Sequence, residues 1–191
     1  MSDDVIADIA QEIVLPPNTM LVHTAGSKPL DILSDAEASR TGVFYPLQTF
    51  SKSKRVDFSE IPIFIESGDK PTEKVLMEMG KAISKKVFKI SSQERRALHV
   101  AAVFASNFTN HMLTIARKIM SDRGLEYEWL KPLIAETVNK SLTIGPEAAQ
   151  TGPAKRGDLE ILDSHMELLK DDEAIAEIYR VISQDIVDRN P

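Results

Sequence analysis

The segment Ser91–Gly124 is the feature that most restricts how this chain can fold. It opens with Ser91-Ser92-Gln93-Glu94, a capping box in which the first hydroxyl accepts the N3 amide and Glu94 accepts the cap amide. Gly124 follows several basic residues, which is typical of a helix C-terminus. The sequence therefore predicts one helix of roughly 30 residues, whereas the mean in globular proteins is about 11–12.

The middle of this helix, over residues 97–120, is apolar on nearly every side. Its large apolar side chains are Leu98, Val100, Val103, Phe104, Phe108, Met112, Leu113, Ile115 and Ile119. A helix that is hydrophobic all round has to be buried. Because a chain of 191 residues has little other material to cover it, we expect a second subunit, in a homodimer, to do so.

Residues 1–90 alternate short strand-like runs with helical ones. A helix from residue 6 is expected, capped by Asp3 or Asp4. Pro62 should place the third strand at an edge of the sheet or delay the start of its pairing. The alternation predicts a mainly parallel sheet covered by helices. Strands are expected over 19–23, 43–45, 61–65 and 87–90, a second helix over 72–84, and later helices over 126–142, 157–170 and 172–187.

The start of this alternating pattern differs from that of a nucleotide-binding α/β unit. Such a unit begins with a strand, a Gly-x-Gly-x-x-Gly turn and a helix, but here the eight glycines are scattered and no strand precedes the first helix. The expected fold class is α/β: a partial Rossmann sheet over 1–90, lacking the N-terminal phosphate-binding βαβ unit. An all-α domain with one long buried helix follows over 91–191.

Composition excludes several classes of function. The net charge of −6 argues against a nucleic-acid partner, and the absence of cysteine removes disulfides and thiol chemistry. No apolar run approaches the roughly 18 residues needed to cross a bilayer, and the acidic N-terminus is unlike a secretory signal. We expect a soluble cytoplasmic protein without a membrane partner.

Polar residues interrupt the apolar helix in two stripes. His99, Ser106 and Asn110 fall within about 40° of one another at 100° per residue, and Asn107, His111 and Thr114 lie beside them. Burying such groups unpaired costs about 1–3 kcal/mol. The stripes form either the polar wall of a substrate cleft or a set of groups that satisfy one another.

The loop Gln150–Asp158 contains two glycines, a proline, a guanidinium and a carboxylate directly before a helix. Arg156 could bind a carboxylate or phosphate in bidentate fashion, and Asp158 could cap the helix. The alternative is a capped interhelical turn with an Arg156–Asp158 pair.

Two further turns follow strands, where ligands bind in open α/β sheets. They are His23-Thr24-Ala25-Gly26-Ser27 and Tyr45-Pro46-Leu47-Gln48. The four histidines are scattered without carboxylate spacing, so no metal site is expected, and His165 is interpreted as a hydrogen-bonded structural residue.

Four segments together resemble one bacterial family. They are His23–Ser27, Gly42–Phe50, Arg96–Phe108 and Gln150–Asp158, in that order. The family consists of Rossmann-like proteins described as NADP oxidoreductases with a C-terminal helical domain of unknown function. Its architecture is similar to that of pyrroline-5-carboxylate reductase and the 6-phosphogluconate and 3-hydroxyacid dehydrogenases.

The resemblance implies an NAD(P)-dependent oxidoreductase in which this chain supplies the substrate-binding and dimerisation part. It implies NADP or NAD as cofactor, bound weakly or not at all by this chain alone, and a small, anionic substrate. Tyr45 occupies a position where the family pattern has a histidine, so an acid–base role for the residue at this position is in doubt. The implied residues are His99 and Asn107 as catalytic, Thr151, Gly152, Arg156, Asp158 and Gln48 as substrate-binding, and His23 and Ser27 as cofactor-binding.

A second hypothesis comes from another class of function. The chain could be a non-enzymatic binding or dimerisation module that has kept the fold and lost the cofactor site. In that case Arg156 and His99 would be dispensable, whereas disruption of the long helix at Phe104 would abolish activity.

Overall fold

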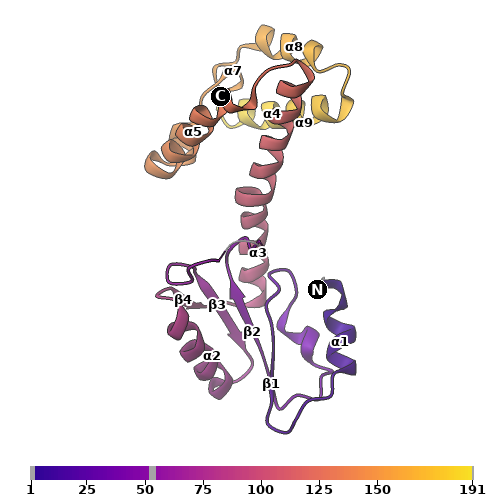
Figure 1. Cartoon of the computed structure of the whole chain (residues 1–191), viewed down its shortest axis with the longest axis vertical. Coiled ribbons are helices and arrows are strands. Elements are labelled where there is room, and N and C mark those ends of the chain that lie inside the picture. The colour runs from indigo at the N-terminus through magenta and orange to yellow at the C-terminus, as the bar shows by residue number, and fades with distance from the viewer. Residues whose placement is uncertain (1–2, 52–54, 191) are drawn as a thin grey trace. The chain divides into compact units, whose positions relative to one another are not determined.

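The computed structural model describes residues 3–51 and 55–190. The chain divides into two compact units, Met1–Asn110 and His111–Pro191, which are described separately below. Their elements are labelled in Figure 1. The division predicted at 90/91 marks the change from strands to helices; as a domain boundary it remains a prediction.

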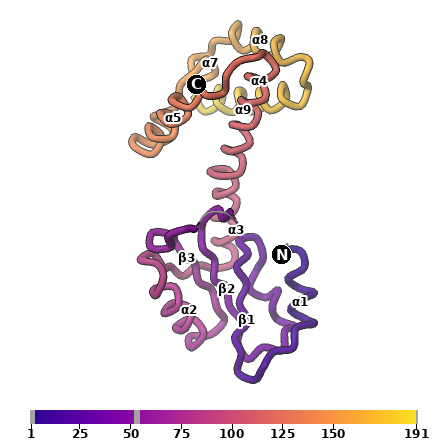
Figure 2. The backbone as a smooth tube through the Cα atoms, in the orientation of Figure 1, coloured from indigo at the N-terminus to yellow at the C-terminus, as the bar shows by residue number. Residues whose placement is uncertain are grey.

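The first unit contains a four-stranded sheet in the order β1-β2-β3-β4. The strands are β1 (Met20–His23), β2 (Arg40–Pro46), β3 (Ile63–Ser67) and β4 (Val87–Lys89). β1 and β4 pair in parallel with their neighbours, but β2 and β3 are antiparallel, with Gly42 opposite Ser67 and Pro46 opposite Ile63. Figure 2 traces this path through the sheet.

The sheet is mainly parallel, as predicted, since two of its three strand pairs are parallel, but the antiparallel central pair was not expected. A parallel connection needs a crossover, usually a helix, and the described part of the segment 47–62 contains none. The chain instead returns antiparallel from the end of β2 to the start of β3. Pro62 delays the start of β3 to Ile63, as expected, but β3 is not an edge strand, since it lies between β2 and β4.

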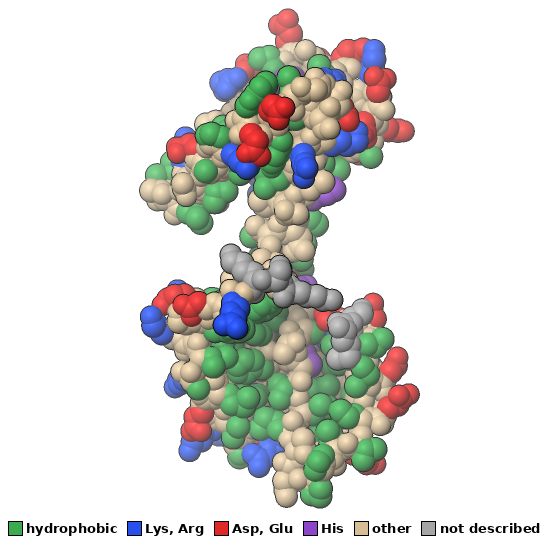
Figure 3. Space-filling model, viewed as in Figure 1, with side chains coloured by type: hydrophobic (Ala, Val, Ile, Leu, Met, Phe, Trp, Pro, Cys, Tyr) green, Lys and Arg blue, Asp and Glu red, His purple; other side chains and the backbone are tan. Residues whose placement is uncertain are grey.

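The core of the sheet lies against α2 (Lys70–Ile83). Ile63, Ile65 and Leu76 are almost fully buried and form one cluster. The Asp69 carboxylate caps α2 by accepting the Thr72 amide at 2.8 Å, so the cap lies three residues before Thr72. Hydrophobic side chains gather over the strands of this unit in the space-filling view (Figure 3).

The N-terminal helix packs beside β1. η1 (Asp3–Val5) leads into α1 (Ile6–Glu12), and η2 (Leu30–Leu33) lies next to it; together they bury Ile6, Ala10, Ala25 and Leu33. The capping prediction was wrong, because Val5 holds the cap position without a side-chain bond. The Asp3 and Asp4 carboxylates instead accept from Ser27 and Lys28.

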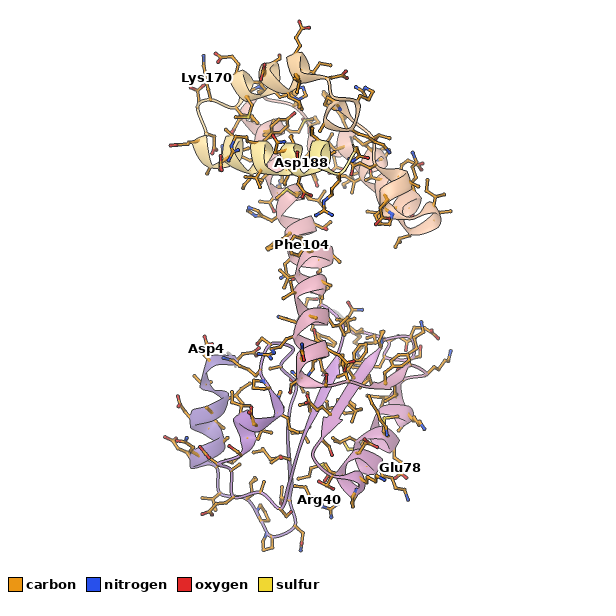
Figure 4. All side chains as sticks on the ribbon, turned by 180° about the vertical axis from the view of Figure 1, so that it is seen from behind. Asp4, Arg40, Glu78, Phe104, Lys170 and Asp188 are labelled. Carbon is orange, nitrogen blue, oxygen red and sulfur yellow. The ribbon has the colours of Figure 1, made fainter. Side chains whose placement is uncertain are left out.

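The long helix is present, with an irregular middle. α3 (Ser92–Ala102) begins with the predicted capping box, continues as the π-helical segment η3 (Val103–Phe108), and becomes α4 (Thr109–Asp122). Its apolar side chains are only partly covered: Phe104, labelled in Figure 4, is 64% exposed and Phe108 is 47% exposed, whereas Leu98 is half-buried.

The second unit is helical throughout. Gly145 and Gly157, both with positive φ, end α5 and α7, where glycine avoids the Cβ strain of the left-handed region. No described helix is long and apolar enough to cross a membrane. After α4 the elements are η4 (Tyr127–Leu130), α5 (Lys131–Ile144), α6 (Pro146–Ala149), α7 (Pro153–Arg156), α8 (Leu159–Leu168) and α9 (Glu173–Asp188).

Arg95 on α3 is the largest fully buried side chain of the first unit. Its Nη1 donates to the carbonyl oxygens of Ala25 at 2.7 Å and Lys28 at 2.6 Å. Its Nη2 lies 2.8 Å from Oε2 of Glu66 on β3. The guanidinium thus ties α3 to β3 and to the loop that follows β1.

Replacing Arg95 by Met should destabilise the first unit by about 3–5 kcal/mol, because Glu66 would keep a largely buried charge without its partner. Amide hydrogen exchange of β2 and β3 measures this loss, since it reports local opening free energies. Arg96→Met is the matched control: Arg96 is exposed, so its loss should stay within about 0.5 kcal/mol. Equal protection in both variants would contradict the role assigned to Arg95.

Candidate functional site

A cavity of about 490 Å³ lies in the first unit, between the segment that follows β2 and one face of α3 and η3. It brings together three residues that the sequence selected separately: His99, Asn107 and Gln48. Its lining combines neutral hydrogen-bonding groups with apolar side chains. The full set is Tyr45, Leu47, Gln48, Thr49, Phe50, His99, Ala102, Val103, Ala105, Ser106 and Asn107.

Tyr45 and His99 form a hydrogen-bonded pair in the wall of this cavity. The Tyr45 hydroxyl lies 3.2 Å from His99 Nδ1, and the two rings meet edge to face with centroids 6.2 Å apart. Burial raises the pKa of Tyr45 above its ordinary value, with a smaller opposing effect from the Arg95 charge. The phenol therefore remains protonated at neutral pH and can take part in a neutral hydrogen bond.

Gly26 provides the space for this pair. A Cβ at this position would lie 2.4 Å from His99 Nδ1 and 2.9 Å from Tyr45 Cζ, closer than real Cβ contacts. The sequence identified Gly26 only as the turn that closes a strand. Its contact with a residue 73 positions later (99 − 26) could not be inferred without the packing of α3 on the sheet.

The π-helical segment supplies the far part of the wall. Val103, Ala105, Ser106 and Asn107 all line the cavity, although they are nearly consecutive. A π turn is wider than an α turn and is frequent at functional sites. The Thr109 hydroxyl donates to the Phe104 carbonyl oxygen at 3.1 Å, which satisfies one acceptor of the irregular segment.

The two residues expected to bind cofactor have partners within the protein. His23 is buried; its Nε2 lies 3.2 Å from the Pro29 carbonyl oxygen and its Nδ1 accepts the Ala25 amide at 3.2 Å. The Ser27 hydroxyl donates to Asp3 at 2.9 Å. The assignment of His23 and Ser27 to the cofactor therefore rests on the resemblance alone.

The loop residues selected by sequence lie in the second unit. Thr151 and Gly152 line a separate, largely apolar cavity of about 310 Å³, together with Tyr179. Arg156 donates from Nε and Nη2 to one carboxylate oxygen of Asp158, at 2.9 and 2.8 Å. This is the Arg–Asp pair that the sequence left as an alternative, although Asp158 makes no side-chain cap bond.

His165 also lies in the second unit, and its Nδ1 is 2.7 Å from the Tyr179 hydroxyl. This contact agrees with its interpretation as a hydrogen-bonded residue. No group of three or more His, Asp or Glu side chains suited to a metal ion occurs in the part of the chain that the structure describes.

Comparisons with known proteins agree with this architecture. Residues 61–186 match the family model described as Domain of unknown function (DUF2520). The crystal structure of a "putative NADP oxidoreductase", BF3122 from Bacteroides fragilis, is 38% identical with a TM-score of 0.91, over 98% of this chain and 73% of that one. Protein TM1727 from Thermotoga maritima is 25% identical with a TM-score of 0.75, over 96% and 77%.

No curated protein matches this chain. The fold class expected from the sequence, a Rossmann-like sheet followed by a helical region, is confirmed by the similarity to BF3122. The first unit thus has the architecture of a Rossmann-like oxidoreductase, with a cavity of mixed polar and apolar lining beside its sheet.

The buried position of His23 generates a prediction about pH. Burial, and secondly the Arg95 charge, lower the pKa of His23 below its ordinary value of 6.5, so the native state takes up its proton at a lower pH than the unfolded chain. Stability from neutral His23 is complete above the unfolded pKa and is lost as the pH falls from there through the folded pKa.

The free energy of unfolding of the first unit should therefore decrease below about pH 6.5, and less steeply in His23→Asn, which keeps an acceptor for the Ala25 amide and does not titrate. His111→Asn, at an exposed position, is the control and should keep the wild-type slope. Identical slopes in wild type and His23→Asn would contradict the prediction.

Proposed function

Because the chain belongs to the family described as Domain of unknown function (DUF2520), we propose that it supplies the substrate-binding and dimerisation part of an NAD(P)-dependent oxidoreductase. The observation that carries the proposal is the cavity where His99, hydrogen-bonded to Tyr45, faces the same space as Gln48 and Asn107. Support comes from BF3122, the "putative NADP oxidoreductase" that is similar over nearly the whole of this chain.

The described residues do not fit the pyrophosphate of NADP or NAD. Such a cofactor supplies the hydride, and its pyrophosphate is normally held by amides of a glycine-rich turn between a strand and a helix. Here the loop after β1 directs the carbonyl oxygens of Ala25, Gly26 and Lys28 at Arg95. We therefore expect NADP or NAD to bind weakly or not at all to this chain by itself.

His99 is the candidate proton donor or acceptor. An imidazole can carry out either role near neutral pH, and this one is half-buried in the cavity wall with Nδ1 engaged by Tyr45. The side-chain amides of Asn107 and Gln48 can each donate and accept, which suits the orientation of a carbonyl or imine group beside His99. The cavity thus binds the reacting end of a small molecule.

For the loop of the second unit, considered by itself, the resemblance predicts binding of an anionic group. Arg156 offers the guanidinium, with Thr151, Gly152 and Asp158 around it. Since Arg156 already shares its Nε and Nη2 with Asp158, an incoming carboxylate or phosphate would have to compete with that pair. The partners that we expect are a small anionic substrate and a second copy of the chain.

The test is a screen of NADPH consumption with carbonyl and imine compounds, run on a version of the chain extended upstream by a strand, a Gly-x-Gly-x-x-Gly turn and a helix. In this extended protein, His99→Gln should lower the rate about 100-fold or more, the usual contribution of a general acid or base. Asn107→Leu should act mainly on KM. Gln93→Ala, in the exposed first turn of α3, is the control. The proposal fails if the extended protein, supplied with NADPH and the full panel, never oxidises the nicotinamide, or if His99→Gln retains the full rate.

A second candidate function is a non-enzymatic binding or dimerisation module. The exposed apolar side chains of the long helix favour it: Val100 is 56% exposed and Phe104 is 64% exposed, and Phe104 contacts Phe108 edge to face. A surface of this kind is typical of an interface.

Phe104→Asp should abolish self-association, measured by sedimentation equilibrium, because it places a charge among apolar side chains. Gln93→Asp adds the same charge in the first turn of α3 and should leave association unchanged. If Phe104→Asp abolishes biological activity while His99→Ala and Arg156→Ala retain it, the module is favoured over the enzyme. The reverse pattern would exclude the module.

A further inference from the structure

His99 is held along one edge of its ring. Its Nδ1 lies 3.2 Å from the Tyr45 hydroxyl, and the same edge faces Gly26, where a Cβ would approach Nδ1 to 2.4 Å and Cγ to 2.8 Å. The other nitrogen, Nε2, has no hydrogen-bond partner among residues 3–51 and 55–190, and the ring lines the cavity. The two nitrogens therefore have different surroundings.

The chemistry of the pair favours one direction for the hydrogen bond. In a neutral imidazole one nitrogen donates and the other accepts, and the bond made by one decides the role of the other. The Tyr45 hydroxyl has no other hydrogen-bond partner among the described residues, so its single proton is satisfied within the protein only by donation to Nδ1. A phenol donating to Nδ1 leaves the ring proton on Nε2.

We propose that Tyr45 is a positioning residue for His99: its hydroxyl donates to Nδ1, so that neutral His99 presents Nε2–H to the cavity as a donor for a substrate carbonyl oxygen or imine nitrogen. This inference rests on the proposed function for the role of His99. It adds a residue to which the resemblance gave no role.

Gly26 is the second part of this arrangement. Arg95 fixes the loop that contains Gly26 by binding the carbonyl oxygens on both sides of it, those of Ala25 and Lys28. The backbone of Gly26 is thus held beside the Nδ1 edge of the imidazole, and only a residue without Cβ leaves room for the ring. The position of the ring is therefore set by one loop, one strand end and one helix.

The tautomer of His99 can be measured directly by ¹⁵N NMR of the four histidines at alkaline pH, where they are neutral. Wild-type His99 should be in the Nε2–H form. Tyr45→Phe keeps a ring to pack against Phe64 but removes the donor, so a measurable Nδ1–H fraction should appear and the Nδ1 resonance should lose its hydrogen-bond shift.

Tyr179→Phe is the matched control, because Tyr179 makes the same type of bond to His165 Nδ1 in the second unit. It should change the His165 resonances and leave those of His99 unchanged. Gly26→Ala should displace the His99 ring and weaken the hydrogen bond to Tyr45. If Gly26→Ala does not fold, Tyr45→Phe still provides the test.

A wild-type His99 in the Nδ1–H form, or a His99 tautomer ratio unaffected by Tyr45→Phe, would overturn the positioning role. The measurement needs neither nicotinamide nor substrate, so it separates the two proposals. A fixed Nε2–H tautomer in a protein that never consumes NADPH would leave the positioning role standing and remove the redox function.

Discussion

The buried guanidinium of Arg95 is the interaction on which the first unit depends. A buried charge is costly unless it is paired and hydrogen-bonded. Here Glu66 and three loop carbonyls bind the two terminal nitrogens of the guanidinium, while its buried Nε has no partner among the described residues. Because these partners come from β3 and from the loop after β1, the helix that carries Arg95 can pack in only one register. One turn later on that helix, His99 consequently meets Tyr45.

The cavity follows from the way α3 packs on the sheet. Tyr45 lies near the end of β2, His99 lies on α3, and Gly26 lies in the loop that Arg95 binds. None of these residue types is unusual in the strand, helix or loop that contains it. Their contact creates an imidazole with one engaged nitrogen and one nitrogen facing open space, which is a suitable arrangement for proton transfer.

Local patterns predicted the elements well and their partners poorly. The capping box at Ser91 and the apolar periodicity gave the long helix, and Pro62 gave the late start of β3, because these signals act within a few residues. The antiparallel β2–β3 pair and the buried Arg95 depend on contacts between distant segments. Sequence patterns were sufficient to select His99, Asn107 and Gln48 as candidates. They could not show the contact between the Tyr45 hydroxyl and His99, because residue spacing does not reveal where a hydroxyl lies in the fold.

The π-helical segment Val103–Phe108 has a consequence for how chains of this family can vary in length. A π turn holds one more residue than an α turn over nearly the same rise. One residue can therefore be removed there, returning the turn to α geometry, while the helix on either side keeps its phase. Elsewhere in α3 or α4 such a deletion would rotate every following side chain by about 100°. Single-residue gaps between relatives are thus best tolerated beside the cavity, where they would reshape its wall.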